Sequence, residues 1–184
     1  SKTKKAPPIR VIILGAGGRD FHNFNTYFRK RSSYRVIAFT AAQIPYIAGR
    51  NYPAQLSGPR YPAGIPIYPE EELSRLLSEH LSDQVVFSYS DVSHEALMDM
   101  ASLVLSKGQD FVFLGPKETM LASRVPVISV CAVRTGCGKS VITRKLASIL
   151  KEKGLNVSVI RHPMAYCGFK PVLRFSSGRD VEEE

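Results

Sequence analysis

The sequence of 184 residues has no apolar run that approaches the ~20 residues needed to cross a membrane. Its first apolar run, Val11–Leu14, is too short for the core of a signal peptide. It contains only three cysteines, an odd number without metal-ligand spacing, and its four histidines are scattered. These absences argue against a membrane partner, a disulfide framework and a zinc site, and they predict a cytoplasmic protein with reduced thiols.

Acidic residues are nearly absent from the first third of the chain. Residues 1–69 contain eleven Lys and Arg against one acid, Asp20, whereas residues 70–184 contain fourteen against fifteen acids. The net charge of +9 therefore arises in the first third and favours an anionic partner. A solvated tail with a basic helix face explains the same charges equally well. Because no Arg-rich tract or RNA-binding aromatic motif accompanies them, nucleic acid is not expected.

Apolar runs that alternate with helical patterns predict an α/β fold with a parallel sheet. The predicted strands cover residues 9–18, 34–40, 83–90, 110–115, 127–133 and 155–160, and the predicted helices 20–31, 70–81, 94–108 and 140–154. Residues 41–69 break this rhythm with six of the twelve prolines and four of the eight tyrosines, so we expect an ordered, extended excursion there. We predict a Rossmann-like domain over residues 1–124, followed over 125–184 by the first β-α-β unit of an incomplete P-loop nucleotide-binding domain.

The glycines after the first strand read GAGGRD, Gly15 to Asp20, and resemble a dinucleotide fingerprint without its third glycine. The second strand ends in AFTAAQ and offers no acid for the ribose hydroxyls of NAD, so a hydride-transfer enzyme is not favoured.

Polar residues gather where the predicted strands end, the edge at which open α/β sheets bind ligands. They predict a polar or anionic small-molecule site, although each alone is explained as a cap or turn residue; Asp91 and Ser93, for example, suit the N-terminus of the helix with His94. The set comprises Arg19, Asp20, His22, Asn23, Gln43, Ser90, Asp91, His94 and Lys117.

The stretch VRTGCGKS, residues 133–140, matches the phosphate-loop pattern except for Val133 at the first glycine. Its glycines let backbone N–H groups face a phosphate, Lys139 can contact the terminal phosphates, and Ser140 can supply a hydroxyl to Mg²⁺. Arg134 is a second catalytic candidate beside Lys139, or a solvent-facing residue. The candidate nucleotide-binding residues are Thr135, Gly136, Cys137, Gly138, Lys139 and Ser140.

The last predicted strand ends in Arg161 and His162, the one polar cluster placed near the predicted phosphate site. We interpret them as candidates to hold an anionic substrate, with a strand-terminating turn as the other reading. A magnesium-binding acid on a later strand, which phosphoryl-transfer enzymes use, is not evident.

The chain resembles the cyclic 2,3-diphosphoglycerate synthetases from about Ile9 to Phe175. The strings that carry the resemblance are RVIILGAGGRDFHNFN, VIAFTAAQIP, YPAGIPIYPEEEL, VVFSYSDVSHE, FVFLGPKETML, AVRTGCGKS and VIRHPM. The resemblance implies a ligase that uses ATP and Mg²⁺ to close an intramolecular phosphoanhydride in 2,3-bisphosphoglycerate. In that reading Lys139 stabilises the β- and γ-phosphates, Ser140 holds Mg²⁺, and the N–H groups of Gly136, Cys137 and Gly138 cradle the nucleotide.

Family members extend well beyond residue 184, so the resemblance implies either a fragment of a longer enzyme or a truncated gene, and full activity is not expected of these 184 residues. Two other functions remain open. One is a P-loop GTPase or NTPase of the metallochaperone kind, and the other is a non-catalytic module that binds a nucleotide or a phosphorylated metabolite. The oligomeric state is not readable from the sequence, and a homo-oligomer remains among the possibilities.

Overall fold

The computed structural model describes residues 6–15, 18–42, 50–79, 81–89, 92–132 and 137–160. The chain divides into two compact units, one of Ser1–Met120 with Pro163–Glu184 and the other of Leu121–His162. We call them unit 1 and unit 2 and describe each by itself. The assignment of the second as the start of a P-loop domain stays a prediction.

Unit 1 is built on a six-stranded sheet with the order β3-β4-β2-β1-β5-β6. All neighbours pair in parallel except β3, which runs antiparallel to β4 at one edge. Counted along the chain, the five parallel strands follow the order 3-2-1-4-5 of Rossmann-type sheets, which reverses between β1 and β5. The predicted Rossmann-like parallel sheet is therefore confirmed for this unit. The strands are β1 (Ile9–Gly15), β2 (Tyr34–Ala41), β3 (Asn51–Tyr52), β4 (Ile65–Pro69), β5 (Gln84–Phe87) and β6 (Asp110–Phe113).

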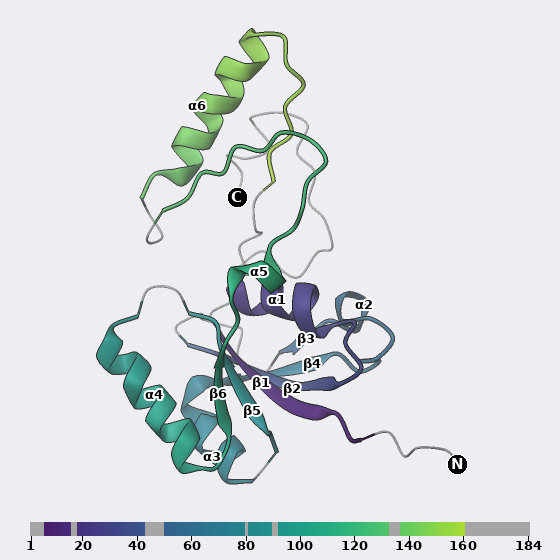
Figure 1. Cartoon of the computed structure of the whole chain (residues 1–184), viewed down its shortest axis with the longest axis vertical. Helices are drawn as coiled ribbons and strands as arrows, with labels where there is room; N and C mark the ends of the chain where they lie inside the picture. Colours follow the sequence, from purple (N-terminus) through teal and green to yellow (C-terminus); the bar gives the residue numbers. More distant parts are fainter. Residues whose placement is uncertain are drawn as a thin grey trace. The chain divides into compact units, whose positions relative to one another are not determined.

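Helices cover both faces of the sheet (Figure 1). On one face, α1 (Arg19–Asn23) continues as the π-helix η1 (Phe24–Phe28) and packs phenylalanines against Val11, Ile13 and Val86. On the other, leucines of α3 (Leu73–Ser78) and residues of α4 (His94–Ser106) pack against Ile12, Leu14 and Val85. The predicted helix starting near Asp20 is confirmed, although its second half takes the π form. The short elements α2 (Ala54–Ser57), η2 (Glu70–Glu72) and α5 (Pro116–Thr119) complete the unit.

The proline-rich excursion at residues 41–69 is more regular than the sequence indicated. Its described part, residues 50–69, contains β3, α2 and β4, and β4 is a parallel neighbour of β2 that the sequence prediction missed. Prolines hid the strand because they interrupt the alternation of Ile65 and Ile67, yet a proline is tolerated where the ladder needs no donor. Tyr61 fixes the segment to the sheet, since its ring is buried and its hydroxyl accepts a 3.1 Å hydrogen bond from the Val36 N–H.

Unit 2 differs from its prediction. Its described helix, α6 (Lys139–Glu152), matches the predicted helix at residues 140–154. The strands predicted at 127–133 and 155–160 are not formed in the described residues 127–132 and 155–160, which is a correction. A strand needs a neighbour for its backbone donors and acceptors, and here the apolar side chains stay exposed, Val127 at 65% and Ile160 at 96%.

None of the helices in the described part of the chain has the length and the apolar composition that a membrane span requires.

We predict that Gly64→Ala destabilises unit 1 far more than Gly108→Ala. Both glycines have a positive φ, +77° and +84°, which costs an alanine about 1–2 kcal/mol. A Cβ on Gly64 would also lie 2.4 Å from the backbone oxygen of Tyr52, whereas one on Gly108 meets nothing within 4 Å. The clash adds roughly 1–3 kcal/mol. Urea unfolding of both variants measures the difference, and equal losses would contradict the clash.

Candidate functional site

A buried carboxylate marks the end of β1. Asp20 is 2% exposed, and its Oδ1 accepts a 2.6 Å hydrogen bond from the Gly18 N–H. A Cβ on Gly15 would lie 2.3 Å from the Cβ of Asp20, so the first glycine of the loop is needed for the helix to approach the strand this closely. The close packing of α1 against the end of β1 is therefore present, although the third glycine of the dinucleotide pattern is missing.

Two further predicted site residues on α1 converge on Thr119, which is 1% exposed at the end of α5. The guanidinium Nη2 of Arg19 donates to the Thr119 hydroxyl at 3.3 Å, and His22 Nε2 lies 2.6 Å from its carbonyl oxygen. These two contacts connect α1, which follows β1, to α5, which follows β6.

Of the other predicted substrate residues, His94 is the one that the structure describes. His94 is exposed at the first position of α4, where Ser93 caps the helix by accepting a 3.1 Å hydrogen bond from the Ala96 N–H. The predicted capping role of Ser93 is thus confirmed. Asp91, Arg161 and His162 lie outside the described residues.

The structure adds two polar contacts at this edge that the sequence did not indicate. Asn23 is 1% exposed; its Nδ2 donates to the Ser88 hydroxyl at 2.9 Å, while its Oδ1 has no hydrogen-bond partner. On the opposite face of the sheet, the Tyr89 hydroxyl donates to Glu70. Burial, and then the neighbouring carboxylate of Glu70, raise the pKa of Tyr89 well above its ordinary value, so the phenol stays protonated. The one sequence feature that drew attention to Glu70 was its position in the first turn of the helix predicted over residues 70–81.

The carboxyl ends of the strands are acidic rather than basic. Among the described residues at 18–23, 42, 70–72, 88–89, 92–95 and 114–119, six carboxylates stand against two fixed cations. The acids are Asp20, Glu70, Glu71, Glu72, Glu95 and Glu118, and the cations are Arg19 and Lys117. Glu72 and Glu118 are ion-paired with Arg75 and Arg31, which lie just outside these ranges, so with these partners the six carboxylates stand against four cations.

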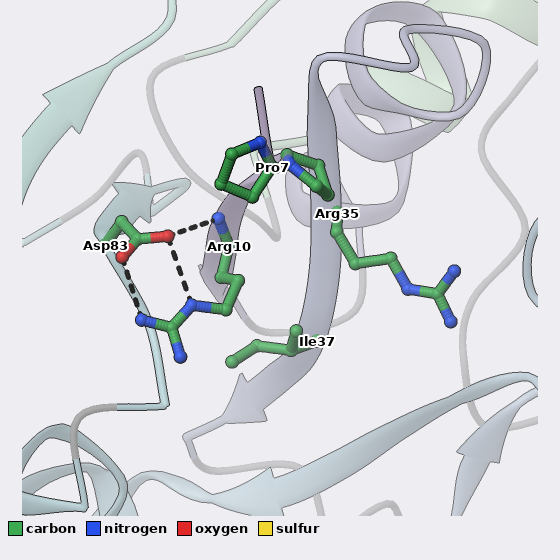
Figure 2. A pocket seen from close by; sticks show the side chains of 6 residues that line it. Pro7, Arg10, Arg35, Ile37 and Asp83 are labelled. Atoms are coloured by element: carbon green, nitrogen blue, oxygen red, sulfur yellow. Dashed lines mark hydrogen bonds and ion pairs between the residues drawn. The ribbon is translucent and has the colours of Figure 1, made fainter. Parts of the chain in front are cut away.

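Part of the basic surface lies instead at the amino ends of β1 and β2. A hollow of about 570 Å³ is lined there by prolines, Ile37 and the pair Arg10 and Asp83 (Figure 2). The Arg10 guanidinium donates to both carboxylate oxygens of Asp83, at 2.9 and 3.2 Å, and its backbone N–H donates to Oδ2 at 2.7 Å. The hollow therefore lies at the edge of the sheet opposite the one where such folds bind ligands.

Of the predicted phosphate loop, the structure describes residues 137–140, at the N-terminus of α6. Gly138 precedes α6 with a φ of +78°, a conformation that favours glycine, and no atom lies within 4 Å of a Cβ built there. Lys139 is partly buried in the first turn and Ser140 is exposed. Arg134, Thr135 and Gly136 lie outside the described residues. Within the described ranges, no group of three or more His, Cys, Asp or Glu side chains could hold a metal ion.

We predict that Asp83→Asn lowers the melting temperature more at pH 7 than near pH 2. Hydrogen bonds from Arg10 lower the pKa of the folded Asp83 carboxyl. Its stabilisation is therefore complete above the unfolded pKa of about 3.9 and is lost as the pH falls through the lower, folded pKa. Thermal unfolding at both pH values tests this, with Asp99→Asn on the exposed side of α4 as the control. An equal loss at the two pH values would show that the charge is not involved.

No protein-family model matches the chain. It is 54% identical over 176 residues to the curated arginine synthetase ArcE of Thermococcus kodakarensis. The alignment covers 95% of this chain and 39% of that protein, so the chain spans about two-fifths of the length of the curated relative it matches. The relative is a synthetase, and membership of the cyclic 2,3-diphosphoglycerate synthetases stays a prediction.

Solved structures give weaker likenesses. UDP-D-quinovosamine 4-dehydrogenase from Vibrio fischeri is 18% identical with a TM-score of 0.45, over 59% of this chain and 79% of that one. RSP, a Rex-family repressor, is 13% identical with a TM-score of 0.45, over 80% of this chain and 63% of that one. At such scores the likeness says nothing about function.

Proposed function

We propose that this chain belongs to an ATP-dependent synthetase that forms arginine, and that it supplies the phosphate loop and a Rossmann-like unit of that enzyme. The observation that carries the proposal is the 54% identity to an arginine synthetase over nearly the whole chain. The acidic carboxyl ends of the strands support it, because they suit a substrate with N–H donors. They suit 2,3-bisphosphoglycerate poorly, since several phosphates need concentrated positive charge.

The chemistry of such a synthetase explains the need for a phosphate loop. Arginine can be formed from its ureido counterpart, citrulline, when a nitrogen replaces the ureido oxygen at the guanidino carbon. That oxygen is a poor leaving group until it accepts the γ-phosphoryl group of ATP. Ammonia then attacks the carbon, and the oxygen departs with phosphate. The balance is citrulline, ammonia and ATP on one side, and arginine, ADP and phosphate on the other.

In this proposal the residues of the loop keep the roles predicted from the sequence. The N–H groups around Gly138 and the first turn of α6 would contact the phosphates, Lys139 would neutralise charge on the transferred group, and Ser140 would hold Mg²⁺. The positive φ of Gly138 directly before the 14-residue helix α6 supports that placement.

The reaction is tested on the full-length gene product with ATP and Mg²⁺. One sample contains citrulline and ammonium and is followed by amino-acid analysis; a second contains 2,3-bisphosphoglycerate and is followed by phosphorus NMR. We expect arginine and ADP in equal amounts in the first and no new phosphoanhydride resonance in the second. A cyclic product, or ATP turnover without arginine, would refute the assignment.

We expect Lys139→Ala to weaken ATP binding by about 10- to 100-fold, because a charge-assisted hydrogen bond is worth roughly 1.5–3 kcal/mol. Calorimetric titration measures the affinity. Lys145→Ala, which removes a cation from the exposed side of the same helix, is the matched control and should leave it unchanged. Equal affinities in the two variants would place the nucleotide elsewhere.

A further inference from the structure

Two segments of unit 1 that meet at the amino end of β2 carry only positive charge. The described residues at 24–36 and 50–64 include no Asp or Glu, and their six cations are Arg29, Lys30, Arg31, Arg35, Arg50 and Arg60. Of these six, Arg31 is the one that forms an ion pair within the described structure, with Glu118 of α5. No carboxylate of the described residues neutralises the others by an ion pair, so this surface attracts anionic groups.

Hydrogen bonds to uncharged groups hold two of these arginines next to each other. The Arg60 guanidinium donates from Nη1 to the carbonyl oxygen of Arg31 at 2.6 Å and from Nη2 to that of Tyr34 at 2.7 Å. Arg35 Nη1 in turn donates to the carbonyl oxygen of Arg60 at 2.9 Å. Because all three acceptors are backbone carbonyls, the contacts fix both guanidinium groups without neutralising them. A guanidinium carries five N–H donors, so both groups keep donors for a further acceptor.

One tyrosine ring supports both guanidinium groups. The Cζ atoms of Arg35 and Arg60 lie 5.0 and 5.8 Å from the centroid of the Tyr61 ring, which is 2% exposed. Two like charges this close to one ring repel each other, so a bound anion would stabilise the arrangement. The bases of a nucleic acid stack on free aromatic faces, whereas Tyr61 is buried and the Tyr27 ring is covered by Arg31 at 3.8 Å. The surface therefore favours carboxylates over a nucleic acid.

The hollow of about 570 Å³ at the amino ends of β1 and β2 adjoins these arginines, because Arg35 lines it together with Ile37 and two prolines. Figure 2 shows the Arg35 side chain pointing away from the pair of Arg10 and Asp83. That pair is internally balanced, so the charge left over at the hollow is that of Arg35. An apolar hollow beside unneutralised arginines has room for an apolar side chain that neighbours a carboxylate.

We propose that Arg35, Arg60 and the adjoining hollow form a docking surface for an acidic segment of a partner protein. Carboxylates of the segment accept hydrogen bonds from the two guanidinium groups, whose planar forks match them, and an apolar side chain of the segment enters the hollow. The surface is open, which suits an extended segment better than a small anion that a closed pocket would hold. It lies at the amino ends of the strands and does not depend on the proposed function.

The test titrates the 184-residue chain with the fluorescent peptide Glu-Leu-Glu-Glu-Leu-Glu at about 50 mM salt. Anisotropy measures the affinity, and the backbone amide resonances of residues 31–37 and 58–61 locate the peptide. We expect saturable binding that shifts these resonances and weakens severalfold at about 500 mM salt. The uncharged peptide Gln-Leu-Gln-Gln-Leu-Gln and the oligonucleotide hexathymidylate should both bind more weakly. Arg35→Gln and Arg60→Gln should each weaken binding of the acidic peptide about fivefold. Arg144→Gln removes the same charge from an exposed position of α6 and should bind like the unaltered chain.

No saturable binding of the acidic peptide up to about 1 mM would overturn the docking surface, as would equal affinities in the three variants. Tighter binding of hexathymidylate than of the acidic peptide would overturn the class of partner. Circular dichroism shows whether each variant is folded; should Arg60→Gln unfold, the exposed Arg35 and the resonances of the unaltered chain decide the outcome. Binding to the 184-residue chain but not to the full-length gene product would show that the protein covers this surface itself, which would also overturn the proposal.

Discussion

β1 lies in the centre of the sheet, and its side chains from Val11 to Leu14 are all 0% exposed. Alternate residues of the strand enter the two apolar clusters, so a shift of one residue would exchange the two cores. The strand has β2 on one side and β5 on the other, and the strand order reverses there. The register of β1 therefore fixes where Gly15 ends the strand, where α1 begins and where the predicted ligand-binding edge lies.

The direction of the strands decides at which end of the sheet each charged residue lies, and composition does not reveal that direction. The basic excess of the first third favours an anionic partner, but a count along the chain does not say where on the fold those charges lie. The fold places Arg10 and Arg35 at the amino ends of β1 and β2 and gathers carboxylates at the opposite edge. A count of charges along the chain cannot distinguish these edges, because only the direction of the strands decides which end each residue occupies.

Sequence patterns predicted most of unit 1 because its strands are apolar runs and because α4 begins at a capping serine, Ser93. β4 was missed because its prolines resemble a loop, and the pairing of Tyr89 with Glu70 was missed because it joins residues 19 positions apart. Asp20 and its glycines were found because their spacing is local. In unit 2 the helix α6 was predictable because its apolar residues recur at helical spacing. The flanking strands are not formed in the described residues, because a strand depends on neighbours that local sequence cannot supply.

In the proposed reaction, ATP activates an oxygen of the substrate so that arginine can form. The most direct measurement uses the full-length gene product with citrulline carrying ¹⁸O in its ureido group, together with ATP, Mg²⁺ and ammonium. We expect the label to appear in inorganic phosphate, seen as an isotope shift of its phosphorus resonance, in proportion to the arginine formed. Unlabelled phosphate accompanying arginine, or labelled citrulline left intact while ATP is consumed, would contradict it.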